Sequence, residues 1–378
     1  MIIKKSISLL SCLVMGICCV TGCSSSSKDG DKDDVKIEKM RDITAKELVS
    51  EMKIGWNLGN TLDADAAEGL AAEVSWGNPT TREDMFTLLK DTGFNVVRVP
   101  VSWSKHMDEN YKVDPAWMKR VKEVVDYGIK QGLYIILNTH HEDWYYPTEE
   151  NKEDDIKQLK ALWKQIAEEF KGYDEHLLFE GLNEPRLRDT SMEWTAGSRE
   201  AQNIINEYEK AFYETVRKSG GNNDKRALLI TGYCASAQGS ALQAIDLPKD
   251  DDHIIVSVHA YLPYDFALAS PGTDKFDPEK DSIPIDTLMM NLETIFTSVD
   301  VPVIITECGC MDKNNTPDRI ACMQYFINAT KELGIPVVVW DNGSFVVGHG
   351  ETFGLMNRDT PAKWRNQELI DAMMECVK

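Results

Sequence analysis

From about residue 43 onward, short apolar runs alternate with segments whose apolar residues recur at helical spacing. One such segment begins at Asp114-Pro115, which supplies an N-cap residue and a proline at the first helical position. Gly132 ends this helix, and the wholly apolar run Leu133 to Leu137 follows it. A continuous apolar run of this length is typical of a parallel strand that is buried on both faces.

The same pattern predicts further helices. Thr80-x-x-Glu83 has the spacing of a capping box, and it predicts a helix that ends near Gly93. Thr316-Pro317 predicts the start of a late helix that stops at Gly334.

Eight apolar runs alternate with these helices, and together they predict an α/β fold with a parallel sheet closed into a (β/α)8 barrel. No G-x-G-x-x-G follows the first run, which counts against an open, dinucleotide-binding sheet. We expect one catalytic domain over residues 43–378, with strands near residues 54–58, 94–99, 133–138, 177–182, 227–231, 253–258, 302–306 and 337–340.

The composition excludes some partners. The 378 residues carry a formal net charge of −21, so nucleic acid and an anionic membrane surface would be repelled. Solubility alone explains the acidity.

The N-terminal residues predict export. Lys4 and Lys5 precede the apolar stretch Ile7 to Val20, which is short for a membrane span and predicts a signal peptide over residues 1–22. Val20-Thr21-Gly22-Cys23 resembles a bacterial lipobox, which implies a cell-surface lipoprotein anchored through a lipid on Cys23. The alternative is an ordinary secretory signal and a secreted protein.

Residues 23–42 are rich in serine and acidic residues, and we expect a disordered tether there. Five cysteines remain beyond it, an odd number whose spacing indicates no disulfide framework. Cys308-Gly309-Cys310 lacks companions at zinc-like spacing, so we predict no metal site. The five are Cys234, Cys308, Cys310, Cys322 and Cys376.

Polar residues gather at the ends of the predicted strands, where active sites of such barrels lie. Two of them, Glu184 and Glu307, end the fourth and seventh strands, on opposing sides of the barrel mouth. Glycoside hydrolysis needs two carboxyl groups, about 5 Å apart for retention of configuration. Arg98 can keep Glu307 ionised, and Tyr261 can donate a hydrogen bond to it. As an acid, Glu184 needs a raised pKa, which the nearby charge of Glu307 would favour.

The remaining strand-end residues suit sugar binding. Asn183 can bind a sugar 2-hydroxyl. His140 and His259 can donate to sugar hydroxyls or orient Glu184, and Trp340 can stack against a pyranose ring. Each residue taken alone has a structural explanation in a loop, an ion pair or the core. The hypothesis therefore depends on their occurring together.

The segment Leu178-Phe179-Glu180-Gly181-Leu182-Asn183-Glu184-Pro185 resembles the acid/base signature of glycoside hydrolase family 5, and Ile304 to Gly309 resembles its nucleophile strand. The resemblance covers about Ile54 to Trp364 and implies a retaining (β/α)8 TIM-barrel enzyme without a cofactor. It implies Glu184 as acid/base and Glu307 as nucleophile. The family's other active-site positions match Arg98, His140, Asn183, His259, Tyr261 and Trp340.

Further segments resemble subfamily 4 of this family, whose members are mostly endo-β-1,4-glucanases. They are Gly55 to Ala64, Trp76 to Pro79, His140 to Glu142 and Gly354 to Arg358. The resemblance implies cleavage of cellulose-type or mixed-linkage β-glucan, with xyloglucan, xylan or mannan as alternatives. It also suggests that Asn60 contacts sugar on the non-reducing side, the alternative being a simple turn residue.

Three long loops, Asp63 to Trp76, Asp143 to Asp155 and Leu262 to Ile283, should rim an open groove suited to endo cleavage. We expect a monomer that binds a polysaccharide. A catalytically inactive glycan-binding surface lipoprotein is the alternative from another class, but such a protein would commonly lose one of the two glutamates.

Overall fold

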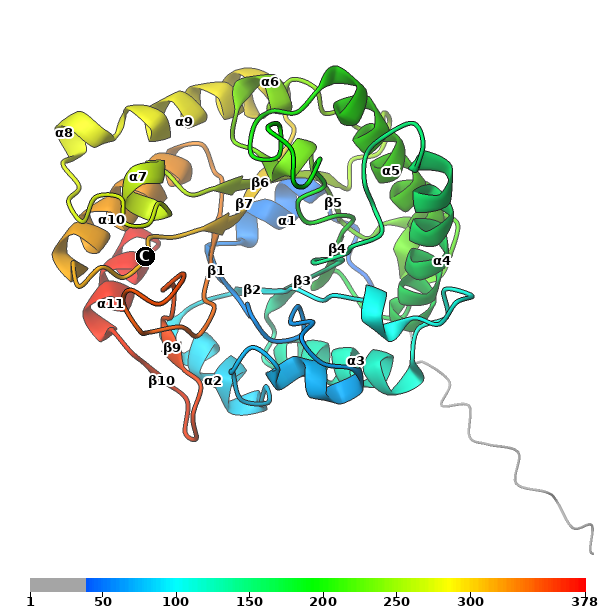
Figure 1. Ribbon diagram of the computed structural model, residues 1–378, viewed down its shortest axis with the longest axis horizontal. Coiled ribbons are helices and arrows are strands. Elements are labelled where there is room, and N and C mark those ends of the chain that lie inside the picture. The colour runs from blue at the N-terminus through cyan, green and yellow to red at the C-terminus, as the bar shows by residue number, and fades with distance from the viewer. Residues whose placement is uncertain (1–38) are drawn as a thin grey trace, which may run out of the picture. The chain divides into compact units, whose positions relative to one another are not determined.

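The computed structural model describes residues 39–378, whose eight central strands form a closed parallel barrel surrounded by helices (Figure 1). The strands follow one another around the barrel in chain order, and β1 closes it by pairing with β8, with Ile54 opposite Val337. The predicted (β/α)8 fold is therefore confirmed.

The strands begin and end within two residues of the predicted ranges. They are β1 Ile54–Asn57, β2 Val96–Val99, β3 Tyr134–Asn138, β4 Leu177–Glu180, β5 Leu228–Ile230, β6 Ile254–Ala260, β7 Val303–Cys308 and β8 Val337–Val339, followed by a small hairpin of β9 Met356–Asn357 and β10 Lys363–Trp364.

Helix α1 lies across one end of the barrel, and the other helices lie around it. They are α1 Ala45–Glu51, α2 Glu83–Thr92, α3 Pro115–Lys130, α4 Lys152–Phe170, α5 Arg199–Arg217, α6 Gly239–Leu242, α7 Tyr264–Ala267, α8 Pro278–Asp281, α9 Ile283–Ile295, α10 Thr316–Glu332 and α11 Gln367–Cys376. Short 3-10 helices are η1 Gly69–Val74, η2 Ser104–His106, η3 Gly221–Asp224, η4 Tyr233–Ala235 and η5 Thr297–Val299.

The sequence signals for α3 are confirmed, since the Asp114 side chain accepts a hydrogen bond from the Ala116 amide at 2.8 Å. The capping box predicted at Thr80 is wrong: α2 begins after Arg82, and no side chain caps it. The reason is a tertiary contact, because the neighbouring Thr81 amide donates to the buried Glu73 carboxylate at 2.7 Å. A capping box does form at α1, between Thr44 and Glu47.

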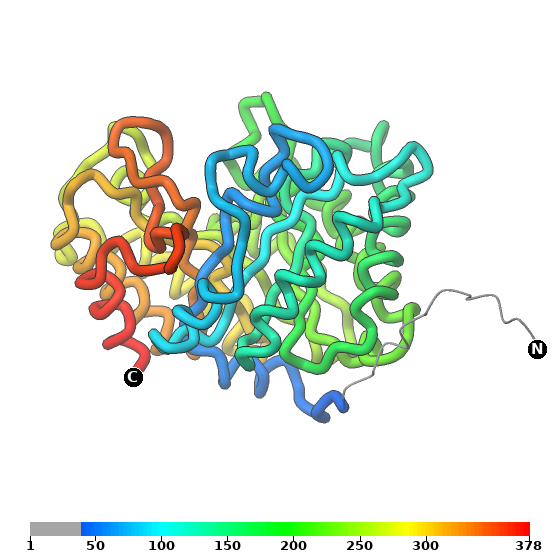
Figure 2. Tube along the Cα trace, turned by 90° about the horizontal axis from the view of Figure 1, so that it is seen from below, coloured from blue at the N-terminus to red at the C-terminus, as the bar shows by residue number. Residues whose placement is uncertain are grey.

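Helix α1 closes one end of the barrel. Its buried side chains pack against residues that alternate along the strands and point into the barrel, among them Val96, Ile136 and Ile304. Figure 2 shows α1 in blue at the opposite end of the barrel from the loop after β1. Strand side chains that face the interior recur every second residue, so the next inward positions lie one layer further from α1.

That next layer is polar. It contains residues that follow apolar strand residues by two positions, such as Arg98 after Val96 and Asn138 after Ile136, and its side chains are fully or almost fully buried. A buried polar layer is stable only when its groups are hydrogen-bonded to one another. Its members include Asn57, Arg98, Asn138, Glu180, Ser257 and Thr306.

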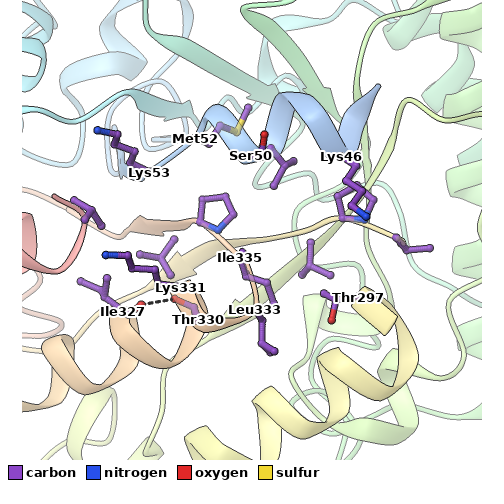
Figure 3. Close-up of a pocket in the computed structure, with 18 of the residues that line it drawn as sticks. Lys46, Ser50, Met52, Lys53, Thr297, Ile327, Thr330, Lys331, Leu333 and Ile335 are labelled. Carbon is purple, nitrogen blue, oxygen red and sulfur yellow. Dashed lines mark hydrogen bonds between the residues drawn. The ribbon is translucent and has the colours of Figure 1, made fainter. Parts of the chain in front are cut away.

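A hollow of about 530 Å³ lies beside α1, between that helix and the segments around β7 and α10 (Figure 3). Its lining is mainly apolar, with Lys46, Lys53 and Lys331 among its polar residues. This end of the barrel is opposite the strand ends that carry the predicted active-site residues.

The expected signal peptide, residues 1–22, and the lipidation site at Cys23 lie outside the described residues. Of the predicted tether, residues 39–42 are described, and the Arg41 amide donates to Glu175 at 3.0 Å. This contact attaches that end of the segment to the barrel. Within residues 39–378, no helix is both long enough and apolar enough to cross a membrane.

Leu48 of α1 is buried against the barrel interior, so we expect Leu48→Ala to lower the free energy of unfolding by about 2–4 kcal/mol through lost packing and a residual cavity. Lys46→Ala on the same helix is the control, because its ion pair with Asp300 is exposed to solvent and should contribute little to stability. Urea denaturation measures both. Equal losses of stability in the two variants would show that α1 does not stabilise the barrel by packing against its interior.

Candidate active site

The carboxyl ends of the strands surround a hollow of about 960 Å³. Of the nine residues expected to act at or bind in the site, six lie in a strand or within two residues of its end, whereas Asn183, Glu184 and Asn60 lie in the loops that follow β4 and β1. All of the nine except Arg98 line the hollow: His140, Asn183, Glu184, His259, Tyr261, Glu307, Trp340 and Asn60. Arg98 lies in the polar layer beneath them, with no exposed surface. The structure thus brings together every residue that the sequence proposed for the site.

Glu307 reaches the hollow because β7 is irregular. Thr306 already faces the barrel interior, where its hydroxyl lies 2.6 Å from that of Ser257. In a regular strand the next residue would point outward. The pairing register of β7 shifts at this point on both sides, and His259 of β6 is left opposite Glu307. Such a bulge re-aims a side chain, and here it turns the Glu307 carboxylate into the barrel.

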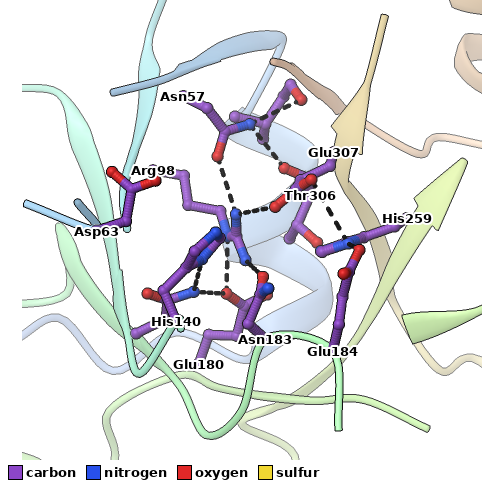
Figure 4. A network of polar contacts seen from close by, with 12 residues as sticks. Asn57, Asp63, Arg98, His140, Glu180, Asn183, Glu184, His259, Thr306 and Glu307 are labelled. Carbon is purple, nitrogen blue, oxygen red and sulfur yellow. Dashed lines mark hydrogen bonds and ion pairs between the residues drawn. The ribbon is translucent and has the colours of Figure 1, made fainter. Parts of the chain in front are cut away.

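Arg98 connects the buried layer to the site (Figure 4). Its Nη1 donates to Glu307 at 2.7 Å, its Nε donates to Glu180 at 2.7 Å, and its Nη2 donates to Asn183 at 2.7 Å. Nη1 also donates to Asn57 at 3.0 Å. Burial alone would lower the pKa of Arg98, but the charges of the two carboxylates outweigh it, so the pKa is raised. The guanidinium therefore stays charged and holds Glu307 in place.

Glu180 is a functional residue that was not predicted for the site, although it lies within the motif Leu178 to Pro185. It has no exposed surface, and it also accepts hydrogen bonds from Ser257 at 2.6 Å and Asn138 at 2.9 Å. A charged residue at the end of the apolar strand β4 was the available signal, since a buried charge requires a partner. Its partner is Arg98, which therefore donates hydrogen bonds to two carboxylates, Glu180 and Glu307.

Glu184 and Glu307 meet at His259. The imidazole Nδ1 lies 2.7 Å from Glu184 Oε1 and 3.6 Å from Glu307 Oε2. One oxygen of each carboxylate lies within 4.8 Å of the other. Tyr261 donates to the second oxygen of Glu307 at 2.8 Å. This separation fits one glycosidic bond between two carboxyl groups and leaves no room for the extra water of an inverting site.

The expected raised pKa of Glu184 is wrong for the free site. Burial does raise it, but the hydrogen bond from His259 and the charges of His259 and Arg186 outweigh burial and hold the pKa of Glu184 below its ordinary value. For His259, burial lowers the pKa, but Glu307 and Glu184 outweigh it and raise the pKa above 6.5. Glu184 and His259 therefore share a proton that resides mainly on the imidazole.

His140 is placed as a hydrogen-bond donor rather than a metal ligand. The Asn138 side chain accepts from the Val101 amide at 3.1 Å and donates to Glu180 at 2.9 Å, which fixes its orientation. Its amide nitrogen lies 3.2 Å from His140 Nδ1, which must therefore accept. The proton is then on Nε2. His140, His141 and Asp63 could otherwise group around a metal ion, but a protonated Nε2 cannot ligate one.

Asn183 and Trp340 keep groups available for a ligand. The Asn183 carbonyl oxygen accepts from Arg98, so its two N–H groups remain free to donate into the hollow. The Trp340 ring is nearly parallel to His140, with ring centroids 5.8 Å apart. Gly59 permits this position, since a Cβ there would lie 2.7 Å from the indole.

Asn60 lies where both of its expected roles, as a turn residue and as a contact to sugar, are open to it. Its backbone is in the left-handed region, with φ of 56°, and its amide donates to Asp63 at 3.0 Å, as in a turn. It also lines the main hollow and a second one of about 520 Å³. Trp76 and Glu351 line both hollows as well, so the two join into one longer cleft.

Comparison with known proteins agrees with this geometry. Residues 61–346 match the family described as cellulase (glycosyl hydrolase family 5). Endoglucanase B of Ruminococcus albus is 49% identical over 98% of this chain and 96% of its own length.

Two solved structures also resemble the chain. One is a GH5-4 broad specificity endoglucanase from Ruminococcus champanellensis with bound cellotriose, with a TM-score of 0.86, 42% identity, and coverage of 89% of this chain and 100% of that chain. The other is a family 5 xyloglucan-specific endo-β-1,4-glucanase from a metagenomic library in complex with cellotriose, with a TM-score of 0.84, 38% identity, and coverage of 88% and 98%. With family match, relatives and barrel-mouth geometry in agreement, the chain belongs to the cellulase family, glycosyl hydrolase family 5, and is a glycoside hydrolase.

Proposed function

We propose that this protein is an endo-acting β-1,4-glucanase of subfamily 4 that hydrolyses with retention of configuration, with Glu307 as nucleophile and Glu184 as acid/base. One observation carries the proposal: an oxygen of Glu184 lies within 4.8 Å of an oxygen of Glu307. Retaining enzymes hold their carboxyl groups about 5 Å apart, whereas inverting enzymes need about 6.5–9.5 Å.

The reaction has two steps. Glu307 attacks the anomeric carbon while the glycosidic bond breaks and the proton of Glu184 passes to the leaving oxygen. Water then attacks the same carbon, its proton passes to Glu184, and the bond to Glu307 breaks. Arg98 and Tyr261 suit this role of Glu307, because each donates to one of its two oxygens and stabilises the carboxylate when it leaves.

His259 supplies and receives the proton that Glu184 uses. In the free site the proton is mainly on the imidazole, 2.7 Å from Glu184 Oε1. As negative charge builds up on the leaving oxygen, the proton transfers to it through Glu184. Asn183 and His140, each with N–H groups directed at the hollow, bind the sugar hydroxyls around the reacting carbon.

The length of the cleft supports endo action. The two joined hollows offer more room than one sugar needs, and of the three predicted rim loops, those of Asp63–Trp76 and Leu262–Ile283 contribute lining residues. The likeness to a xyloglucan-specific enzyme makes xyloglucan the second candidate substrate. An inactive glycan-binding protein does not fit a chain that keeps both carboxyl groups and all their hydrogen-bond partners.

The proposal includes export and attachment to the cell surface through a lipid on Cys23, supported by the lipobox-like sequence. It also includes action as a monomer.

We expect Glu307→Ala and Glu184→Ala each to lose about a thousandfold or more in kcat/KM on β-glucan, because each removes a group that acts in the transition state. Azide distinguishes the two roles when an aryl β-cellobioside is the substrate. With Glu307→Ala it should give an α-glycosyl azide, and with Glu184→Ala a β-glycosyl azide.

Glu351→Gln, which alters a third carboxyl group of the cleft, is the control and should give no azide product. Proton NMR of the first wild-type hydrolysis product should show the β anomer. A β azide from Glu307→Ala, or an α anomer from the wild type, would refute the assignment.

The activity of the enzyme should fall with rising pH as Glu184 and His259 lose their shared proton, above pH 6.5 because the pKa of His259 is raised. In His259→Asn only Glu184 can carry that proton. A proton that two sites share is bound at least as tightly as a proton on one of those sites alone, so the variant should lose the proton at a lower pH than the wild type. The alkaline limb of the kcat/KM profile should therefore move to lower pH. A limb that stays in place or moves upward would exclude proton sharing.

Endo action should lower the viscosity of a soluble cellulose derivative early, when few reducing ends have formed, because internal cuts shorten chains quickly. Viscometry and a reducing-end assay on the same sample measure both. Viscosity that falls only in proportion to reducing ends would indicate exo action instead.

A further inference from the structure

Three sulfur atoms meet in the core where the segment after β7 packs against α10. Cys310 Sγ lies 3.5 Å from Cys322 Sγ and 3.8 Å from Met323 Sδ. Cys310 follows the end of β7, whereas Cys322 and Met323 are neighbours on α10. Each of the three residues is at most 4% exposed. We call these three side chains the sulfur cluster.

The sulfur cluster brings together ligands of one chemical kind. From the sequence, no metal site is predicted for Cys308-Gly309-Cys310, because no companions follow at zinc-like spacing. The fold supplies companions for Cys310 from α10. Two thiols and a thioether are soft ligands, which select Cu(I) over hard cations such as Mg²⁺. Zinc prefers four nitrogen, oxygen or thiolate ligands, so this set suits a soft monovalent cation better than zinc.

The distances favour metal binding over disulfide formation. A disulfide holds its two sulfurs about 2 Å apart, so Cys310 and Cys322 would have to approach by about 1.5 Å inside a close-packed core. A trigonal ion with metal–sulfur bonds of about 2.3 Å keeps neighbouring sulfurs about 4 Å apart. The observed separations of 3.5 Å and 3.8 Å are close to that spacing. Binding of an ion therefore requires the smaller movement.

A small cavity allows this movement. It has a volume of about 10 Å³, and Cys310 and Met323 line it together with Trp340. Trp340 also lines the main hollow of the active site. The sulfur cluster thus lies directly behind the wall of the cleft.

Arg319 can balance the charge of a bound ion. Its Nε donates to the backbone oxygen of Cys310 at 3.1 Å, and the residue is only 2% exposed. The hydrogen bond with Cys310 and burial raise the pKa of Cys322, so this thiol carries its proton in the metal-free protein. When Cu(I) binds, two S–H bonds break, two Cu–S bonds form and two protons leave. The two thiolates and the ion then carry one negative charge beside the buried guanidinium.

We propose that Cys310, Cys322 and Met323 form a binding site for one soft monovalent cation of the Cu(I) type. The two thiolates bind the ion, and Met323 Sδ is the third ligand. A cation held there joins the segment that follows the nucleophile strand to α10. The site uses none of the carboxyl groups of the cleft, so it is independent of the proposed reaction and can be measured without substrate.

Competition with bicinchoninate, which forms a coloured complex with Cu(I), measures the affinity under anaerobic, reducing conditions. The wild type should remove one equivalent of Cu(I) from this complex. Cys310→Ser and Cys322→Ser should each lose at least about a hundredfold in affinity, since even changes outside the ligand set cost up to that much. Met323→Leu, which keeps the volume of the side chain, should lose less.

Cys376→Ser is the matched control, because it removes a buried free cysteine outside the sulfur cluster and should bind Cu(I) as the wild type does. Thermal unfolding of each metal-free variant checks its fold. X-ray absorption at the copper edge examines the loaded wild type without any substitution. It should show three sulfur neighbours about 2.3 Å from the ion.

Four results would overturn the inference. The wild type could leave the copper with bicinchoninate, or Cys310→Ser and Cys322→Ser could bind it unchanged. The absorption spectrum could show nitrogen or oxygen neighbours in place of sulfur. Finally, peptide mapping of the purified protein could find Cys310 joined to Cys322, since a disulfide leaves no thiolate for the ion.

Discussion

The active site depends on one buried cation. Arg98 has no exposed surface and donates four hydrogen bonds, which reach β1, β4, the segment after β4, and β7. Two of its partners, Glu180 and Glu307, are buried carboxylates, and a buried charge requires an opposite charge beside it. Because the guanidinium is planar and rigid, it also fixes the directions of these side chains. The same contact therefore stabilises the polar layer and aims the nucleophile.

This layer explains how one barrel combines stability with reactivity. The end closed by α1 is apolar and contributes packing, the middle layer is polar and fully paired, and only the outermost layer presents groups that lack protein partners. Conformational freedom is thus removed where the site is held, whereas hydrogen-bonding capacity remains where a ligand binds. The irregularity of β7 belongs to this arrangement, because it places Thr306 in the middle layer and Glu307 in the outer one.

Much of this could be predicted from the sequence, because buried parallel strands are apolar throughout and polar residues that follow them must meet at one end of a barrel. Arg98, Glu184 and Glu307 were found in this way. Tertiary contacts could not be predicted in the same way. Thr80 has a capping-box pattern, but the Glu73 carboxylate accepts a hydrogen bond from the amide of the next residue, Thr81, and the segment stays extended until α2 begins. The pKa of Glu184 was misjudged because His259 approaches it from β6, which local spacing does not reveal, and because Arg186, two residues further along the same loop, lies 3.5 Å from its carboxylate.

The central claim is that Glu307, and neither of the other two carboxylates around Arg98 and His259, bonds to the sugar. Peptide mass spectrometry tests this directly after the enzyme has reacted with a 2-deoxy-2-fluoro-β-cellobioside that carries a dinitrophenyl leaving group, because the fluorine makes the ester with the nucleophile long-lived. The account predicts one added fluorocellobiosyl group, carried by the peptide that contains Glu307 and located on that residue. A sugar attached to Glu180 or Glu184, or turnover with no covalent adduct, would contradict it.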